Sequence, residues 1–232
     1  MTTKTLARGS ITRTANKMRR KERILSCARQ IIATRGYDAL TLSQLASDAE
    51  VTIPTIHNLL GKKSQIIEHL VGDVVSRIGQ ILSRQRGGDP ISVIQLFTEE
   101  LILLYASDEA LYKAAFVAAE RAKLFEHLTP QGVFMRSVEL AVQVCGDAKA
   151  KGYLLGEIET EVLAEQLFGS QRLARHDWMN NYIDLKTYKS RVLSGMFTIL
   201  AADAEPSFRD RLISEIRELS VQLPSQKNAK RT

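Results

Sequence analysis

The sequence predicts an all-α protein in which a small N-terminal helical domain is followed by a larger helical domain. Apolar residues recur at three- and four-residue spacing along most of the chain, and no segment alternates in the way that a strand does. Glycine and proline breaks divide this pattern into helix-sized segments. With 232 residues, 44% of them apolar and 25% charged, the chain is long enough to bury a substantial core.

Positive charge is concentrated at the N-terminal end. Residues 1–90 contain 15 Lys and Arg against 7 Asp and Glu, a net charge of +8, whereas residues 91–232 contain 17 against 19, a net charge of −2. The first 35 residues alone contain 10 basic residues and one acid, Glu22. This distribution favours a polyanionic partner, either a nucleic acid or an anionic membrane surface.

The first 34 residues divide into a polar part and an amphipathic part. Residues 1–16 are rich in Thr, Arg, Lys and Ala with almost no large apolar side chains, so we expect a disordered basic arm. Residues 17–34 carry an apolar helical stripe that ends before Gly36, a residue suited to a left-handed helix stop. The basic residues able to reach phosphates or a neighbouring minor groove are Arg8, Arg13, Lys17, Arg19 and Arg20.

Residues 41–63, TLSQLASDAEVTIPTIHNLLGKK, predict two short helices joined by a tight turn. Thr41 and Thr52 can each cap one helix, because a threonine hydroxyl accepts a backbone N–H of the first turn. Pro54 lies early enough in the second helix for its missing N–H to cost nothing. Each helix then has one apolar face for burial, which leaves the other face exposed.

The exposed face of the second helix is small, neutral and hydrogen-bonding, and two lysines follow it. The major groove of B-DNA admits one α-helix, whose short side chains read base edges while lysines bind phosphates. Paired short helices also occur in all-α proteins that never bind DNA, so their spacing leaves both interpretations open. The candidate DNA-binding residues are Thr41, Ser43, Thr52, Ile53, Pro54, Thr55, His57, Asn58, Lys62 and Lys63.

This segment resembles the DNA-binding domain of the TetR family. The resemblance rests on a leucine–threonine pair, an alanine one turn later, the run V-T-I-P-T-I at residues 51–56 and a lysine after the second helix. It covers roughly residues 21–70, and it departs from the family where His57, Asn58 and Leu60 replace the usual aromatic residues. The resemblance implies a helix-turn-helix DNA-binding domain at residues 17–63 and a larger ligand-binding and dimerisation domain.

The rest of the chain is expected to be helical. Residues 64–86 predict a connecting helix capped by Ser64, and a break follows in which Asp89 can cap the next helix and Pro90 can occupy its first turn. A helical body at 87–223 and a polar tail at 224–232 complete the chain. The helices expected in the body are 91–106, 109–125, 131–151, 159–180, 185–202 and 206–223.

A body of this size suits the sensing of a small molecule, because ligand pockets are mostly apolar with a few polar groups. An aromatic residue at helical spacing is, taken singly, more often a core residue than a pocket residue. The candidate ligand-pocket residues are Leu104, Tyr105, Tyr112, Phe116, Phe134 and Phe168.

The chain is also expected to form a homodimer. A two-fold dimer matches a palindromic operator and doubles the length of DNA that is read. In the family, the last two long helices of the body form a four-helix bundle with their mates, which here implies residues 161–179 and 185–200. The apolar residues expected at this interface are Val162, Leu167, Trp178, Val192, Met196 and Ile199.

Other function classes receive less support from the sequence. No motif of hydrolases, dinucleotide-binding enzymes, P-loop NTPases, zinc proteases or EF-hands occurs, so we expect no enzyme, no metal and no cofactor. Cys27 and Cys145 belong to no CxxC pair and are expected to be small buried hydrophobes. The predicted protein is a cytoplasmic, ligand-released repressor. The alternatives are a helical lipid-binding protein or enzyme whose basic arm docks on a membrane, and an adaptor without a ligand.

Overall fold

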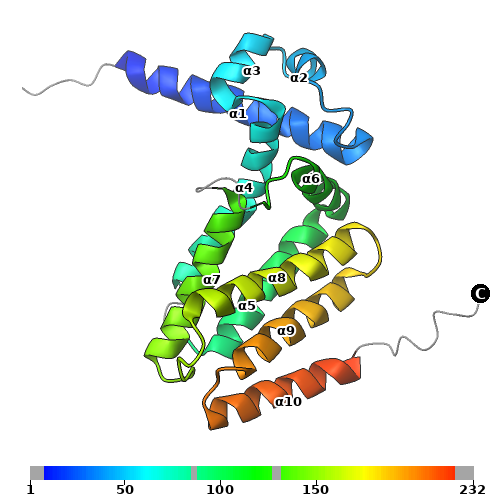
Figure 1. The fold of residues 1–232 in the computed structure, drawn as a ribbon. Helices are drawn as coiled ribbons and strands as arrows, with labels where there is room; N and C mark the ends of the chain where they lie inside the picture. The colour runs from blue at the N-terminus through cyan, green and yellow to red at the C-terminus, as the bar shows by residue number, and fades with distance from the viewer. Residues whose placement is uncertain (1–7, 85–87, 127–131, 223–232) are drawn as a thin grey trace, which may run out of the picture. The chain divides into compact units, whose positions relative to one another are not determined.

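The computed structural model describes residues 8–84, 88–126 and 132–222, and the regular elements among them are helices (Figure 1). An isolated antiparallel bridge pairs Leu154 with Ala204. The predicted all-α fold is confirmed. The helices are α1 (Arg8–Arg35), α2 (Leu42–Asp48), α3 (Ile53–Leu60), α4 (Lys63–Arg84), α5 (Pro90–Ser107), α6 (Glu109–Arg121), α7 (Val133–Ala150), α8 (Thr160–Met179), α9 (Leu185–Ala201) and α10 (Pro206–Gln222).

These helices form two compact units. The first comprises residues 1–73 and 110–124, so it contains α1, α2, α3, the first half of α4 and nearly all of α6. The second comprises residues 74–109 and 125–232 and contains the other helices. The connecting helix expected at 64–86 is therefore shared between the two units.

The first unit has its core between α1, α2, α3 and the start of α4. Gly36 ends α1 with a φ of +79°, as its place after the apolar stripe predicts. Helix α4 begins at Lys63 instead of after Ser64, because the Gln65 side chain accepts the backbone N–H of Lys62 at 2.8 Å and takes the capping role. The buried apolar residues of this core are Ile24, Leu25, Ala28, Ile31, Ile32, Leu40, Leu45, Ile56, Leu60, Ile66, Ile67 and Leu70.

The expectation of a disordered arm at residues 1–16 is wrong for residues 8–16. Helix α1 begins at Arg8 and includes them, while residues 1–7 lie outside the described part. The side chains from Arg13 to Arg20 are all exposed, so burial does not hold residues 13–20 in place. The buried C-terminal half of α1 supplies the costly helix nucleus, and extending an existing helix costs far less than starting one, so the helix continues through 8–16 despite its weak helix formers Thr12, Thr14 and Asn16.

The second unit packs α5, α7, α8, α9 and α10, with α9 lying between α8 and α10 (Figure 1). The predicted cap at Asp89 is confirmed, because its carboxylate accepts the Ser92 backbone N–H at 3.1 Å. Helix α5 has the length and the mean hydropathy, 1.2 over 18 residues, of a membrane span, a test that buried core helices also pass. It contributes Ile91, Ile94 and Leu101 to the core of this unit.

Asp203 joins two loops of the second unit. Its carboxylate is buried at the α9–α10 junction and accepts three backbone N–H groups before α8, those of Gly156 at 3.0 Å, Glu157 at 2.9 Å and Ile158 at 3.2 Å. Hydrogen bonds to a charged group are the strong ones, and a buried donor left without its acceptor is costly.

We expect Asp203→Ala to lower the free energy of unfolding by roughly 2–4 kcal/mol, because three donors then lose their acceptor. Urea unfolding followed by circular dichroism measures the change. Asp210→Asn, an exposed acid on α10, is the matched control and should change stability by less than about 0.5 kcal/mol. Equal stabilities of Asp203→Ala and the parent would show that the carboxylate does not hold the junction.

Candidate nucleic-acid interface

The two short helices of the first unit are set by their caps and by the turn between them. Thr41 accepts the Gln44 N–H at 3.1 Å, and Thr52 accepts the Thr55 N–H at 3.3 Å, so both predicted caps are confirmed. Glu50 takes a left-handed conformation with a φ of +51°, and Val51 donates back to the Ala46 carbonyl at 3.0 Å. This closed turn fixes the angle between α2 and α3.

Helix α3 buries one face and exposes the other. Ile56 and Leu60 are buried against the core of the first unit. Pro54, His57 and Asn58 are exposed, as is Ile53, with 39% of its surface accessible. The exposed side chains are short and neutral, and they offer an imidazole and an amide to hydrogen-bonding partners.

Two of the predicted DNA-binding hydroxyls already have hydrogen bonds within the helix start. The hydroxyls of Thr52 and Thr55 lie 2.9 Å apart, and Thr55 is half-buried. Thr41 is exposed, but its hydroxyl caps α2, while Ser43, two residues further on, is also exposed. The groups freest to meet an external partner on α3 are therefore His57 and Asn58.

The two lysines after α3 differ in their surroundings. Lys62 is exposed. The ammonium of Lys63 lies 3.9 Å from the centre of the Tyr37 ring, a cation–π contact. Desolvation lowers the pKa of Lys63 below its ordinary value, the nearby carboxylate of Asp38 acts to raise it, and the Arg121 guanidinium acts to lower it. Lys62 is the better placed of the two to bind phosphate.

Helix α1 adds a basic wall, of which residues up to 16 were expected to form a disordered arm and residues from 17 onward a helix. Arg13, Asn16, Lys17 and Arg20 of α1 line one groove together with Thr55 and Asn58 of α3. The groove encloses about 730 Å³ and opens to solvent. The helical periodicity of residues 13, 16, 17 and 20 was the signal in the sequence, because these positions share one helix face.

The geometry of this interface is accompanied by a match in sequence. Residues 24–70 match the family of bacterial regulatory proteins named for TetR. The chain belongs to the TetR family. It is a helix-turn-helix transcription regulator. No curated protein matches the amino-acid sequence of this chain significantly.

Solved structures share the fold of this TetR family protein at low sequence identity. SmeT, the repressor of the Stenotrophomonas maltophilia multidrug efflux pump SmeDEF, has a TM-score of 0.62 and 19% identity over 81% of this chain and 92% of SmeT. A second SmeT structure is a complex with triclosan. NalD, the secondary repressor of the MexAB-OprM pump in Pseudomonas aeruginosa, has a TM-score of 0.54 and 16% identity over 79% of this chain and 96% of NalD.

A γ-butyrolactone receptor described as ArpA-like is a third relative in structure. Its TM-score is 0.55, with 17% identity over 89% of this chain and 100% of the receptor. At these identities the likeness concerns the fold. It extends well beyond residues 24–70, because the coverage includes most of the larger helical domain.

The residues predicted to line a ligand pocket are distributed over both units. Tyr105, Phe134 and Phe168 belong to the second unit and are buried, whereas Tyr112 and Phe116 lie on α6 in the first unit. The Tyr105 and Trp178 rings stack with centroids 4.8 Å apart, and Phe134 meets Phe168 edge to face at 5.2 Å. Leu104 is half-buried, like Tyr112. Their contact with a ligand stays a prediction.

A buried polar chain beside these aromatic residues was missed by the sequence reasoning. Gln171 donates to the Tyr188 hydroxyl at 2.9 Å, and Arg175 donates to the Gln171 side-chain oxygen at 3.1 Å. The Arg175 guanidinium lies 4.2 Å from the centre of the Phe125 ring. Burial raises the pKa of the Tyr188 hydroxyl, so it stays neutral and available as a hydrogen-bonding group. The i, i+4 spacing of Gln171 and Arg175 on an apolar helix face was the available signal.

Most of the residues expected at the dimer interface belong to the core of one protomer. Leu167, Trp178, Val192 and Met196 are buried within the chain, and Ile199 is half-buried. The assignment of those four buried residues to an intersubunit seam is therefore wrong. Helices α8 and α9 pack closely on each other, as shown by Gly195, where an added Cβ would come within 1.9 Å of the Ser170 hydroxyl oxygen.

The outward face of α8 carries exposed apolar side chains instead. Val162 is 50% accessible and Leu173 is 66% accessible. Gly169 lies between them in sequence and has no atom within 4 Å of an added Cβ, so another chain could approach it closely. The positions 162, 169 and 173 share one helix face.

The cysteines and histidines form no chemical centre in the part of the chain that the structure describes. No group of three His, Cys, Asp or Glu residues there could hold a metal ion. Burial raises the pKa of Cys145 to about 12, helped by the Asp203 charge, so this thiol is inert at neutral pH. Cys27 is half-buried, and desolvation together with Asp48 raises its pKa as well.

Proposed function

We propose that this TetR family protein is a dimeric repressor that reads a palindromic operator with α3 and is released by a small, largely apolar ligand. The observation that carries the proposal is the exposed neutral face of α3 beside the basic face of α1. Base edges are read by short hydrogen-bonding side chains, and phosphates are bound by Arg and Lys. One surface thus offers both kinds of contact.

A membrane-docking function has less support from the same helix. Interfacial helices bury a face of large apolar residues in the headgroup region. Between Arg13 and Arg20, Met18 is the large apolar side chain, and polar or basic residues surround it. Binding to duplex DNA, compared with binding to vesicles of anionic phospholipid at the same salt concentration, distinguishes the two functions.

Release by a ligand would follow from a shift between two conformations. A ligand that prefers the DNA-incompetent conformation weakens DNA binding by the same factor by which DNA weakens ligand binding. The aromatic interior around Tyr105 and the polar chain from Arg175 to Tyr188 provide the chemistry for a mainly apolar ligand with a polar end. The triclosan complex of SmeT supports this proposal as an analogy of fold.

Dimerisation is proposed through the outward face of α8, with α9 beside it. Val162 and Leu173 would meet a second copy, and Gly169 would allow close approach. Two reading heads would then engage the two halves of a palindrome.

Selection of bound duplexes from a random pool tests the proposal as a whole. We expect the full-length protein to enrich a palindromic sequence. Retention of the pool without enrichment at any salt concentration would overturn sequence-specific DNA reading, because charge alone gives nonspecific binding.

With that operator in hand, Asn58→Ala is expected to relax preference at one base-pair position of each half-site, at a cost of roughly 1–3 kcal/mol for the preferred base. Lys62→Ala should weaken binding to all sequences alike, since a phosphate contact carries no sequence information. Competition binding with single-base operator variants measures both effects. Identical profiles for the two mutants would show that α3 does not lie in the groove as proposed.

A further inference from the structure

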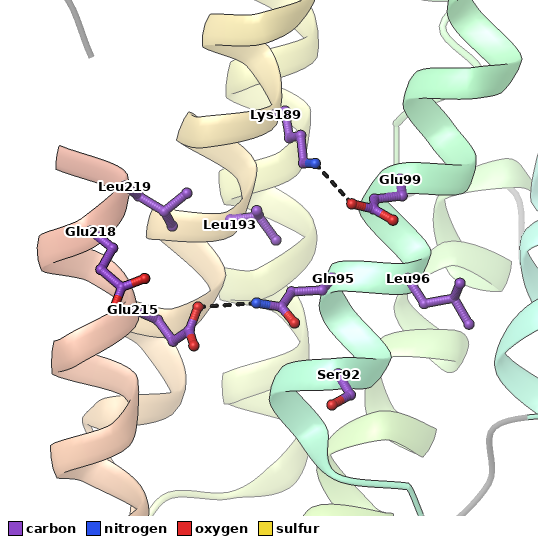
Figure 2. A pocket seen from close by; sticks show the side chains of 9 residues that line it. All are labelled: Ser92, Gln95, Leu96, Glu99, Lys189, Leu193, Glu215, Glu218 and Leu219. Carbon is purple, nitrogen blue, oxygen red and sulfur yellow. Dashed lines mark hydrogen bonds and ion pairs between the residues drawn. The ribbon is translucent and has the colours of Figure 1, made fainter. Parts of the chain in front are cut away.

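A groove on the second unit lies between α5 and the consecutive helices α9 and α10, which follow it much later in the sequence. Helices α5 and α10 each pack against α9, and the groove opens between them (Figure 2). It has a volume of about 490 Å³, within the range of pockets for small organic molecules. It is separate from the DNA-reading face, which belongs to the first unit.

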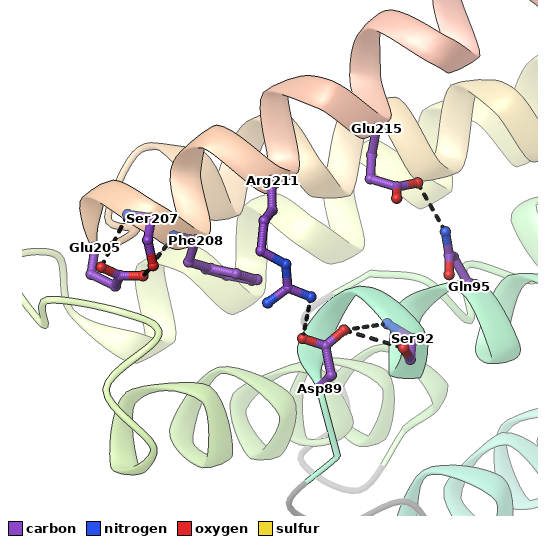
Figure 3. Close-up of polar contacts among 8 residues, drawn as sticks. All are labelled: Asp89, Ser92, Gln95, Glu205, Ser207, Phe208, Arg211 and Glu215. Atoms are coloured by element: carbon purple, nitrogen blue, oxygen red, sulfur yellow. Dashed lines mark hydrogen bonds and ion pairs between the residues drawn. The ribbon is translucent and has the colours of Figure 1, made fainter.

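Two polar contacts hold the walls of this groove at a fixed separation. The Arg211 guanidinium of α10 donates to the Asp89 carboxylate at 2.7 Å, at the beginning of α5 (Figure 3). The Gln95 amide donates to the Glu215 carboxylate at 3.0 Å, one and a half turns further along α5. Desolvation acts to raise the pKa of Asp89, but the hydrogen bonds from Arg211 and Ser92 outweigh it and lower the pKa. The ion pair is therefore intact at neutral pH.

The groove combines an apolar floor with an acidic rim. Leu193 is buried at its base, and Leu96 and Leu219 are half-buried beside it. A leucine floor of this kind favours an apolar ligand body, because burying it removes apolar surface from water.

The acidic rim gives the groove a negative charge. Three carboxylates, those of Glu99, Glu215 and Glu218, face one ammonium, that of Lys189, so the lining has a formal charge of −2. Lys189 is already paired with Glu99 at 2.9 Å. Among the described residues, no cation lies within ion-pair distance of Glu215 or Glu218, and the amide of Gln95 leaves the charge of Glu215 in place. In a protein of net charge +6, this groove attracts cations and repels nucleic acid.

We propose that this groove binds an amphiphilic organic cation. The ammonium group of the ligand pairs with Glu215 and Glu218, and its apolar body lies over the three leucines. The pairing is electrostatic and nondirectional. The groove therefore selects any ligand that has a positive charge and an apolar body, and not one particular molecule. The inference stands on the second unit alone and does not depend on the proposed regulation by DNA binding.

Isothermal titration calorimetry on the full-length protein tests this site with two matched probes. Octyltrimethylammonium carries the required charge, and octanesulfonate carries the same alkyl chain with the opposite charge. We expect the cation to bind and the anion to show no saturable heat. Equal binding of both, or binding of neither to the folded protein, overturns the proposal.

Substitutions that remove the negative charge of the rim test whether the cation binds in this groove. Glu215→Gln with Glu218→Gln should weaken the cation about tenfold or more, since two ion pairs are lost without a change in side-chain size. Gln95→Lys should act in the same direction, because it places an ammonium beside Glu215. The matched control, Glu139→Gln with Asp210→Asn, removes two exposed charges elsewhere in the unit and should leave the affinity unchanged.

Thermal unfolding by circular dichroism confirms that each variant is folded before its affinity is compared. An affinity unchanged by Glu215→Gln with Glu218→Gln in a folded protein overturns the site. A chain ending at Gln222 completes the test, because the residues after it include Lys227, Lys230 and Arg231 and no acid. If the cation binds only to this shortened chain, the chain's own basic segment occupies the groove in the full-length protein. That result would overturn the proposal.

Discussion

Replacing Arg13, Lys17 and Arg20 together by glutamine is expected to remove most of the salt dependence contributed by α1. Each phosphate contact adds about 0.9 to the slope of log affinity against log salt, so three contacts account for a slope of about 2.7. Between 50 and 200 mM salt, the parent protein should lose about 40-fold more affinity than the triple variant. Fluorescence anisotropy with a labelled operator duplex over this range measures the difference.

The preferred operator sequence should survive the triple substitution, because His57 and Asn58 are untouched and phosphate contacts carry no sequence information. A matched control replaces Lys151, Arg209 and Arg217, three exposed basic residues of the second unit, by glutamine. The control removes the same charge and should leave the slope nearly unchanged. Equal slopes for both triple variants would assign the effect to net charge and not to α1.

A proline tests whether the helical form of this segment matters. Met18 is 68% accessible, and Met18→Pro removes a helical hydrogen bond and clashes with the preceding turn while all basic residues remain. If the helical form of α1 positions Arg13 and Lys17, this variant should lose nearly all of the salt dependence that these two residues contribute. A disordered arm would tolerate the proline, and an unchanged slope would restore the sequence-based expectation for residues 8–16.

The features predictable from the sequence are those fixed by local chemistry. Thr41, Thr52 and Asp89 cap helices because their side chains reach a backbone N–H three residues away, a distance set within one segment. Gly36 stops α1 for a similarly local reason. The all-α fold and the exposed face of α3 follow from the same short-range periodicity.

The features that escaped prediction depend on which helices meet. Lys63 contacts the Tyr37 ring only because the first unit brings α4 beside the loop after α1. Arg175 of α8 reaches Phe125, in the turn after α6, in the same way. The acidic groove forms only when α5 packs beside α9 and α10, about 80 residues or more away in the sequence, so no local pattern predicts it. Hydrophobic periodicity identifies a buried face but not its partner.

Met196 shows how this ambiguity affects the dimer. Its apolar spacing on α9 fits a seam between two protomers as well as a core within one, and the structure places it in the core, where it is 7% accessible. We expect Met196→Asp to cost several kcal/mol, because a charge is then buried without a partner. The result should be loss of the helical circular dichroism signal of the second unit.

Leu173→Glu is expected to give the opposite outcome. Leu173 is 66% accessible on α8, so a glutamate there should change the stability of one protomer by less than about 0.5 kcal/mol. In a dimer formed by this face, the same charge would be desolvated at the centre of the interface and should convert the protein into a folded monomer. Sedimentation velocity together with circular dichroism measures mass and fold on one sample.

Leu103→Glu on α5, also 66% accessible, is the matched control and should stay dimeric. The folded Leu173→Glu monomer should keep its reading head but lose the second half-site, and linked half-sites gain a factor of about 10²–10⁴ from effective concentration. Operator affinity should fall accordingly while affinity for an isolated half-site stays the same. A folded, fully dimeric Leu173→Glu protein would place the seam on another surface, and equal loss of full-site and half-site affinity would show that the substitution damages the reading head itself.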